Sequence, residues 1–375
     1  MKLKQMLVEM LKFKASDLHL RVGIRPHLRV NGLLEPIQTD PLTIDEMENV
    51  VTQILNETQL DRFRRKNEMD LALSVAKLGR FRINLFRQRG TTGIAIRAVN
   101  TQIPQFDELN LPDTLRTLSM EKRGMIVITG TTGSGKSTTL AAMIEQMNAS
   151  RIDNVLTVED PIEYIYRDKK CIISQREVGA DTESFATALR YSLRQDPDVI
   201  LIGEIRDVET MSIALTAADT GHLVLTTLHT LNAVETLSRI ISFFPPHQHQ
   251  QIRLLLAGTL KAVVCQRLLT RSDMPGRVPA LEILVSTAAI RDCLLSQEKT
   301  AAIIDLIEQG EQYGMMSFDQ SIMRLYRTGM ISFEEAMTQC TNPDDFDLRV
   351  KGITGAADRW TASKSGEEQS DLHKI

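Results

Sequence analysis

Residues 130–137, near the middle of the chain, constrain the fold more than any other segment. They read G-T-T-G-S-G-K-S and match the pattern G-x-x-x-x-G-K-[ST]. Residues 125–129 form an apolar run immediately before it, and apolar side chains recur at helical spacing after it. The latter are Leu140, Met143, Ile144 and Met147. The order strand, glycine-rich loop and helix is that of a P-loop, and it predicts an α/β core that binds a phosphorylated ligand.

The chemistry of this loop assigns roles to its residues. Glycines let successive backbone N–H groups face one anion, and the N-terminus of the following helix adds partial positive charge at the same point. Lys136 is expected to reach the β and γ phosphates, and the Ser137 hydroxyl is expected to bind Mg²⁺. The predicted binding residues are Gly130, Thr132, Gly133, Ser134, Gly135, Lys136, Ser137 and Thr138. The loop does not distinguish adenine from guanine.

A carboxylate at the end of an apolar strand is the second candidate. Residues 199–202 read V-I-L-I and are followed by Gly203 and Glu204. Hydrolysis of a γ-phosphate needs an oriented water and an acceptor for its proton, and a carboxylate beside the phosphate loop can provide both. An apolar strand that ends in glutamate can also be purely structural. Together with the loop, Glu204 is predicted to be the general base.

The remaining pattern predicts two domains. Short buried runs at 125–129, 155–158, 199–202 and 223–227 alternate with helical segments, which is typical of a parallel sheet covered on both faces, and residues 288–347 are predicted to be helices with loops. Residues 1–100 predict a small α+β domain with an antiparallel sheet, including a hairpin at Asn31-Gly32 and strands at 70–75, 79–86 and 93–99. We place a linker at 101–118, the main domain at 119–350 and a loose tail at 351–375.

Composition excludes several classes of protein. The 375 residues carry a net charge of −4, which lacks the overall basic charge expected of a nucleic-acid binder, and aromatic residues make up 5%. The four cysteines are far apart, which predicts buried reduced thiols rather than a zinc site. No run reaches the length and apolarity of a membrane-spanning helix. Residues 1–14 have the spacing of an amphipathic helix, for which docking on its own domain or on a membrane are both open.

Three further segments carry a family resemblance. Residues 157–163, T-V-E-D-P-I-E, look like the acidic Asp box, and residues 221–230, G-H-L-V-L-T-T-L-H-T, look like the His box of secretion-type ATPases. With G-E-I-R-D at 203–207, the chain resembles the type IV pilus retraction ATPases, the PilT/PilU group of the secretion ATPase superfamily. The resemblance extends from A-S-D-L-H-L at 15–20 to Asn342-Pro343.

The resemblance implies more than the residues alone. It implies a PAS-like N-terminal domain, a RecA-like P-loop ATPase core, and a homo-hexamer whose ATP sites lie at domain or subunit junctions. Glu163 matches the Asp-box acid near the attacking water, and His229 matches the histidine that senses the γ-phosphate. Arg82 and Arg97 match paired arginines directed at the nucleotide, although an arginine-rich strand is also typical of a solvated face.

The chain also differs from other members of this superfamily. It lacks the tetracysteine insertion and the longer N-terminal region of assembly and type II secretion ATPases, which favours retraction. The implied protein is a cytoplasmic motor, peripheral at the inner membrane face, that acts on an inner-membrane pilus platform protein. Leu295 and Ser296 replace the Arg and Glu of the family's A-I-R-N-L-I-R-E helix, so an accessory paralogue that assists another pilus ATPase stays open. A RecA-like nucleic-acid motor is the remaining alternative, and we expect no nucleic-acid partner.

Overall fold

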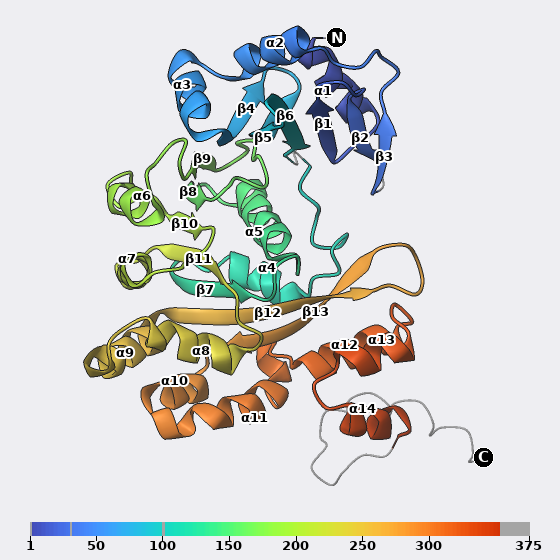
Figure 1. Cartoon of the computed structure of the whole chain (residues 1–375). Coiled ribbons are helices and arrows are strands. Elements are labelled where there is room, and N and C mark those ends of the chain that lie inside the picture. The colour runs from blue at the N-terminus through green and yellow to red at the C-terminus, as the bar shows by residue number, and fades with distance from the viewer. Residues whose placement is uncertain (1, 31, 100–101, 353–375) are drawn as a thin grey trace, which may run out of the picture. The chain divides into compact units, whose positions relative to one another are not determined.

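The protein forms two compact units in a computed structural model that describes residues 2–30, 32–99 and 102–352 (Figure 1). The first unit contains residues 1–103 together with 161–167 and 176–183, and the second contains 104–160, 168–175 and 184–375. Each unit has its own sheet. The mixed α/β fold class predicted from the sequence is confirmed, with a RecA-like P-loop core preceded by a small α+β domain.

The first unit is built on a six-stranded antiparallel sheet in the order β3-β2-β1-β6-β5-β4. Its strands are β1 (Asp17–Arg21), β2 (His27–Val30), β3 (Leu33–Pro36), β4 (Glu68–Val75), β5 (Gly79–Gln88) and β6 (Thr91–Ala98). Its helices are α1 (Leu3–Lys12), α2 (Ile44–Ile54) and α3 (Glu57–Lys66). The three strands predicted at 70–99 are confirmed, and so is the hairpin, because Val30 pairs with Leu33. Asn31 itself lies outside the described residues.

Helix α1 packs on its own domain. Leu3, Met6, Leu7 and Met10 are buried at the spacing of one helical face and join the apolar core of the first unit. Phe13 and Val8 stay largely exposed. The predicted amphipathic helix is therefore confirmed, with its apolar stripe facing the sheet.

Two short segments from later in the chain complete the first unit. Residues 161–167 and 176–183 belong to it, and the Glu177 carboxylate makes polar contacts that connect them. The Glu177 carboxylate accepts hydrogen bonds from Arg80 Nη2 at 3.1 Å and from the backbone N–H of Ile162 at 3.2 Å. Because the Glu177 side chain is only 9% exposed, this ion pair is shielded from water and links the two segments to β5.

The second unit is built on a seven-stranded sheet in the order β13-β12-β7-β11-β10-β8-β9. Its strands are β7 (Gly124–Thr129), β8 (Asn154–Glu159), β9 (Ile172–Glu177), β10 (Val199–Ile202), β11 (Leu223–Leu228), β12 (Leu260–Thr270) and β13 (Arg277–Val285). The last two residues of β9, 176 and 177, count with the first unit. Strands β12, β7, β11, β10 and β8 run parallel, and β13 is antiparallel to β12. All four predicted core strands are confirmed. Strands β9, β12 and β13 were not predicted.

Helices cover this sheet and continue beyond β13. They are α4 (Asp113–Ser119), α5 (Lys136–Ser150), α6 (Phe185–Ser192), α7 (Val208–Asp219), α8 (Ala233–Ser242), α9 (His249–Thr259), α10 (Ala288–Leu295), α11 (Ile303–Glu308), α12 (Phe318–Arg327), α13 (Phe333–Gln339) and α14 (Pro343–Val350). The helical prediction for 288–347 is confirmed. Helix α4 begins inside the segment 101–118 that was predicted to be a linker and ends one residue beyond it, with Pro112 at its N-cap and Asp113 in its first turn.

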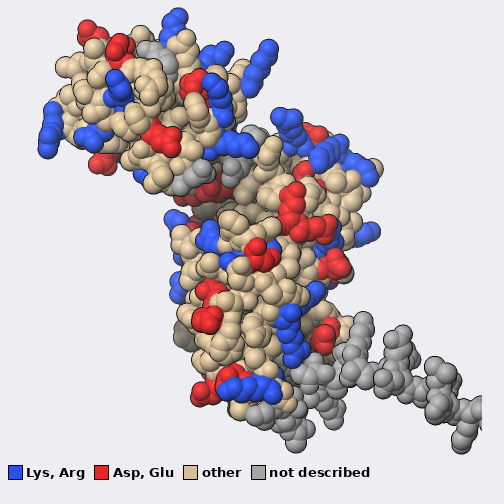
Figure 2. All heavy atoms as spheres, turned by 90° about the vertical axis from the view of Figure 1, so that its right-hand side faces the viewer, with Lys and Arg blue, Asp and Glu red and all other residues tan. Residues whose placement is uncertain are grey.

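The described surface mixes both signs of charge. Figure 2 shows Lys and Arg side chains interspersed with Asp and Glu over the visible face of the chain. Among residues 2–30, 32–99 and 102–352, no helix is long and apolar enough to span a bilayer. The predicted tail falls almost entirely on residues 353–375, which lie outside the described residues.

Candidate functional site

The phosphate loop connects β7 to α5, as the motif predicts. Gly130, Gly133 and Gly135 have φ angles of +142°, +80° and +90°, a region that side chains with a Cβ avoid. A Cβ on Gly130 would lie 2.3 Å from the Gln266 carbonyl oxygen, and one on Gly135 would lie 2.8 Å from Gln266 Nε2. All three glycines thus have a backbone conformation that other residues rarely adopt, and Gly130 and Gly135 also approach β12 closely.

Lys136 is the buried cation of this loop. It is 8% exposed, and its Nζ donates hydrogen bonds to the carbonyls of Gly130 at 2.7 Å and Thr131 at 3.1 Å. Burial lowers the pKa of this ammonium group, and the charge of Glu204 offsets only part of that effect. An anion at the loop would supply the charge compensation that the protein provides only in part.

Two hydroxyl groups extend the site around Lys136. Ser134 is 3% exposed, and its buried Oγ has no hydrogen-bond partner, as expected of a position that a ligand oxygen can complete. Ser137 is the second residue of α5 and is exposed. Within the described ranges, no group of three or more His, Cys, Asp and Glu side chains is arranged to hold a metal. A divalent ion here would depend on Ser137, ligand phosphates and water.

Glu204 lies two residues after the end of β10 and has two partners. Its Oε1 lies 3.2 Å from His229 Nε2, and its Oε2 accepts a 2.8 Å hydrogen bond from Arg206 Nη2. Thr227 connects the ends of β10 and β11, because its hydroxyl donates a 2.7 Å hydrogen bond to the Gly203 carbonyl. The predicted base and the predicted histidine are thus brought together at one sheet edge, where the charge of Glu204 also acts on Lys136.

The environment of Glu204 favours its ionised form. Burial raises the pKa of this carboxyl. The hydrogen bond and charge of Arg206, together with His229, lower it by more than burial raises it, so the pKa lies below its ordinary value. Glu204 is therefore a carboxylate near neutral pH. Its favourable contribution to the free energy of unfolding is present above the unfolded-state pKa of about 4.3 and is lost as the pH falls through the lower folded-state pKa.

Replacement of Arg206 tests this account. In Arg206→Ala the main pKa-lowering group is gone, so we expect the pKa of the Glu204 carboxyl to rise, as measured by ¹³C NMR titration of labelled glutamate. Arg206→Lys keeps the charge and should leave an intermediate pKa. An unchanged pKa in Arg206→Ala would show that burial and His229 set the ionisation of Glu204.

The predicted arginines belong to the first unit. Arg82 on β5 and Arg97 on β6 are directly opposite each other in the antiparallel register, and both are exposed. Arg97 Nε donates a 2.8 Å hydrogen bond to Asp17 Oδ1, and Ser16 donates to the other oxygen of Asp17. Because Arg97 is 66% exposed, this pair orients the guanidinium and adds little stability.

Glu159 and Glu163, two glutamates of the Asp box, belong to different units. Glu163 lies in the 161–167 segment of the first unit and is exposed. Glu159 ends β8 in the second unit, is 8% exposed, and accepts a 2.7 Å hydrogen bond from the Thr157 hydroxyl. The Glu159 Cα would lie 3.3 Å from a Cβ on Gly203, so this buried acid adjoins the strand end that carries Glu204.

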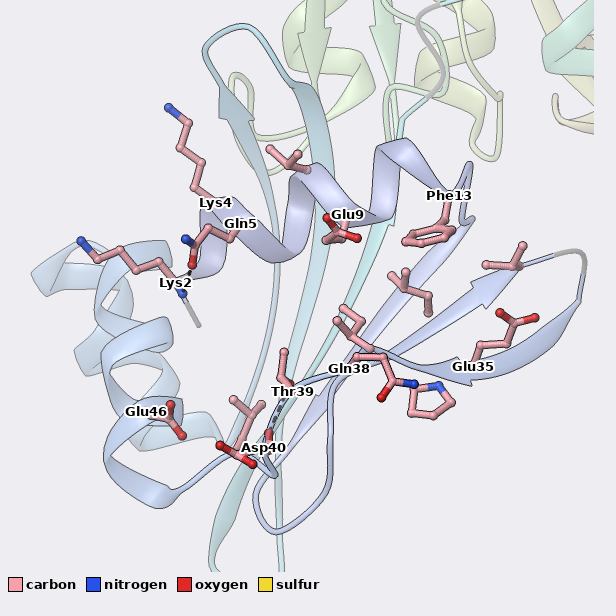
Figure 3. Close-up of a pocket in the computed structure, with 16 residues that line it drawn as sticks. Lys2, Lys4, Gln5, Glu9, Phe13, Glu35, Gln38, Thr39, Asp40 and Glu46 are labelled. Atoms are coloured by element: carbon pink, nitrogen blue, oxygen red, sulfur yellow. Dashed lines mark hydrogen bonds between the residues drawn. The ribbon is translucent and has the colours of Figure 1, made fainter.

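A cavity in the first unit contains none of the predicted site residues. It has a volume of about 1030 Å³ and lies between α1 and the segment from β2 to residue 46. Figure 3 shows Glu9 of α1 and Phe13, just after that helix, on one side and Glu35 of β3 and Gln38 on the other. Its lining mixes Lys2 and Lys4 with several carboxylates and contains no glycine-rich phosphate-binding motif, so the phosphate loop remains the candidate site.

Sequence reasoning missed several residues that organise the site. Arg206 lies inside the recognised G-E-I-R-D segment, and its charge beside Glu204 was a usable signal. Asp17 lies inside the A-S-D-L-H-L segment, but its pairing with Arg97 depends on the β1–β6 register. Gln266 carried no motif signal, because its contacts join segments 132 residues apart.

Comparison with known proteins assigns the family. The chain is 40% identical to the type IV pilus ATPase PilU of Pseudomonas aeruginosa over 98% of its own length and 96% of PilU. It is 39% identical to PilT, described as a type IV pilus retraction ATPase, of the same organism over 92% of this chain and all of PilT. A crystal structure of the pilus retraction motor PilT with bound ADP matches with a TM-score of 0.85 and 39% identity, covering 92% of this chain and 98% of that chain. A model of the type II/IV secretion system protein family matches residues 1–338. The chain therefore belongs to the type II/IV secretion system protein family, within which it resembles the pilus retraction ATPases.

Proposed function

We propose that this chain is a Mg²⁺-dependent ATPase that assembles as a hexamer and powers type IV pilus retraction, and thereby twitching motility. The observation that carries the proposal is the joining of a buried Lys136 in a phosphate loop with an ionised Glu204 at the adjacent sheet edge. The names of its relatives, PilT, PilU and a twitching motility protein of Neisseria gonorrhoeae, supply the biological setting.

The geometry supports a division of labour in hydrolysis. The loop backbone and Lys136 would hold the β and γ phosphates of ATP, with Ser134 Oγ as a further partner. Mg²⁺, held by Ser137 and the phosphates, would supply charge neutralisation. Glu204 would orient a water and accept its proton. His229, whose Nε2 lies 3.2 Å from Glu204 Oε1, would sense the γ-phosphate beside this carboxylate.

The first unit would complete the site during the cycle. Arg82 and Arg97 offer two guanidinium groups on one face of its sheet, which suits charge that develops on a transferring phosphoryl group. Glu163 would act near the attacking water. In a hexamer, closing of one unit over a bound nucleotide and its reopening after hydrolysis would be the power stroke.

The partner would be an inner-membrane pilus platform protein. We place the motor in the cytoplasm, peripheral to the inner membrane, where its stroke would return pilin subunits to the membrane. Measurement of ATP turnover by the purified chain, combined with pilus retraction in a deletion strain complemented with this chain, tests the proposal. We expect hydrolysis and restored retraction. Absence of nucleotide binding, or normal retraction in the uncomplemented deletion strain, would overturn the main-motor assignment.

One observation favours an accessory role as the second candidate. Leu295, the last residue of α10, and Ser296 after it stand where the A-I-R-N-L-I-R-E helix of the retraction ATPases has Arg and Glu. An accessory paralogue would bind nucleotide and strengthen another pilus ATPase. The two roles differ in the deletion strain, because loss of an accessory protein leaves retraction that is weaker but present.

A further inference from the structure

Strand β12 brings one buried amide side chain against the phosphate loop. Cys265 on β12 pairs with Thr129, the last residue of β7 before the loop, so Gln266 stands beside the start of the loop. Side chains alternate along the strand, and the neighbouring Arg267 bonds the Gln339 carbonyl and stacks on Phe318 among the C-terminal helices. Gln266 therefore faces the loop while Arg267 faces the helical layer.

Both ends of the Gln266 amide are used. Its Nε2 donates a 2.8 Å hydrogen bond to the carbonyl oxygen of Ser134, and its Oε1 accepts a 2.8 Å hydrogen bond from the Thr139 hydroxyl. The Ser134 carbonyl can only accept, so it fixes which end of the amide faces the loop. The donor and the acceptor of one side chain thus bridge the loop and the first turns of α5.

The bridge spans the residues that we propose contact phosphate. Ser134 and Thr139 bracket Lys136 and Ser137, so holding the first pair at fixed separation also fixes the backbone between them. Gln266 is 3% exposed and Thr139 is 1% exposed, so water does not replace either bond. The close approach of Gly135 to Gln266 Nε2 leaves no room for another side chain at this point.

We infer that Gln266 is a positioning residue for the nucleotide: it keeps the phosphate loop and the start of α5 in the geometry that binds the β and γ phosphates. The inference rests on the proposed function, since it concerns the same site. Gln266 has no role in proton transfer, because it acts through the backbone of residues 134–139. A side chain that cannot both donate and accept should leave the loop mobile and its N–H groups misaligned.

The test compares ADP affinity among full-length variants, measured with a fluorescent ADP analogue and Mg²⁺. Gln266→Met keeps the volume but removes both hydrogen bonds, and we expect affinity to fall on the order of tenfold. Gln266→Glu should also bind weakly, because a carboxylate oxygen would face the Ser134 carbonyl. Thr139→Val removes one bond and should cost about threefold. The double variant Gln266→Met with Thr139→Val should match Gln266→Met, because both disrupt one bridge.

A matched control separates positioning from general stability. Ser321→Ala removes another buried hydrogen bond of the same sheet, the 3.0 Å bond that the Leu281 N–H donates to Ser321 Oγ on α12. It should lower the melting temperature and leave ADP affinity unchanged. If wild-type protein fails to bind ADP, the proposed function fails. If wild type binds and both Gln266→Glu and Thr139→Val bind within twofold of it, the proposed function stands and the inference about Gln266 is wrong. If Gln266→Met does not fold, those two variants decide the matter.

Discussion

The Lys136→Ala variant is expected to lose at least about a hundredfold in ATP turnover and to bind ATP too weakly to saturate, because removal of one preorganised donor to a reacting oxyanion costs 10²- to 10³-fold. Lys136 Nζ is buried within the loop and bonds only loop carbonyls. Its pKa is lowered by burial, which shows that the folded chain compensates this charge incompletely. The bound phosphates would complete that compensation, so most of the effect should appear in nucleotide affinity.

The same reasoning predicts that nucleotide-free stability is kept. Because the Lys136 charge is unfavourably buried, its removal should not lower the melting temperature without nucleotide, although it should abolish the increase that ATP gives to wild type. Lys122→Ala is the matched control, since Lys122 is an exposed lysine just before β7, at the opposite end of that strand. Both quantities follow from calorimetry and a phosphate-release assay. Wild-type ATP affinity in Lys136→Ala would contradict the assignment of the loop.

The core strands could be predicted because their signals are local. Strands β7, β8, β10 and β11 are continuous apolar runs bounded by loops, and a strand buried on both faces has that pattern. Strands β12 and β13 lacked such boundaries. Helix α9 ends at Thr259 and β12 begins at Leu260, so no loop between them marks the change of structure. Pro279 weakened the signal for β13, and it is tolerated because β13 is an edge strand.

The position of a site residue could be predicted only where a single segment of the sequence contains the signal for it. The loop residues are contiguous, and Glu204 comes two residues after β10, so motif and strand end sufficed to place both, while their roles in binding and hydrolysis stay predictions. The bridge from Gln266 to Ser134 and the pair of Asp17 with Arg97 depend on strand register, which no local pattern in a single sequence specifies. Roles for His229, Glu163, Arg82 and Arg97 came from family resemblance, and they stay predictions.

The Glu204→Gln variant is expected to reduce ATP turnover by about 10²- to 10⁴-fold, the usual contribution of a general base, while nucleotide affinity changes little. The amide keeps the shape of the carboxylate and can still accept from Arg206, so the strand end should retain its structure. It cannot accept a proton from water, whereas the wild-type carboxyl, whose pKa is below its ordinary value, is ionised at neutral pH.

The Glu204→Gln variant separates ATP binding from ATP hydrolysis. Lys136→Ala should fail at binding, and Glu204→Gln should bind ATP and stall, so equilibrium ATP binding combined with single-turnover hydrolysis distinguishes the two steps. Glu209→Gln is a matched control, because Glu209 is an exposed acid on α7 that pairs with Arg190. An unchanged rate in Glu204→Gln would remove Glu204 from the role of base. Glu159 would then be the acid to test next, since it is the buried carboxylate that ends the neighbouring strand β8.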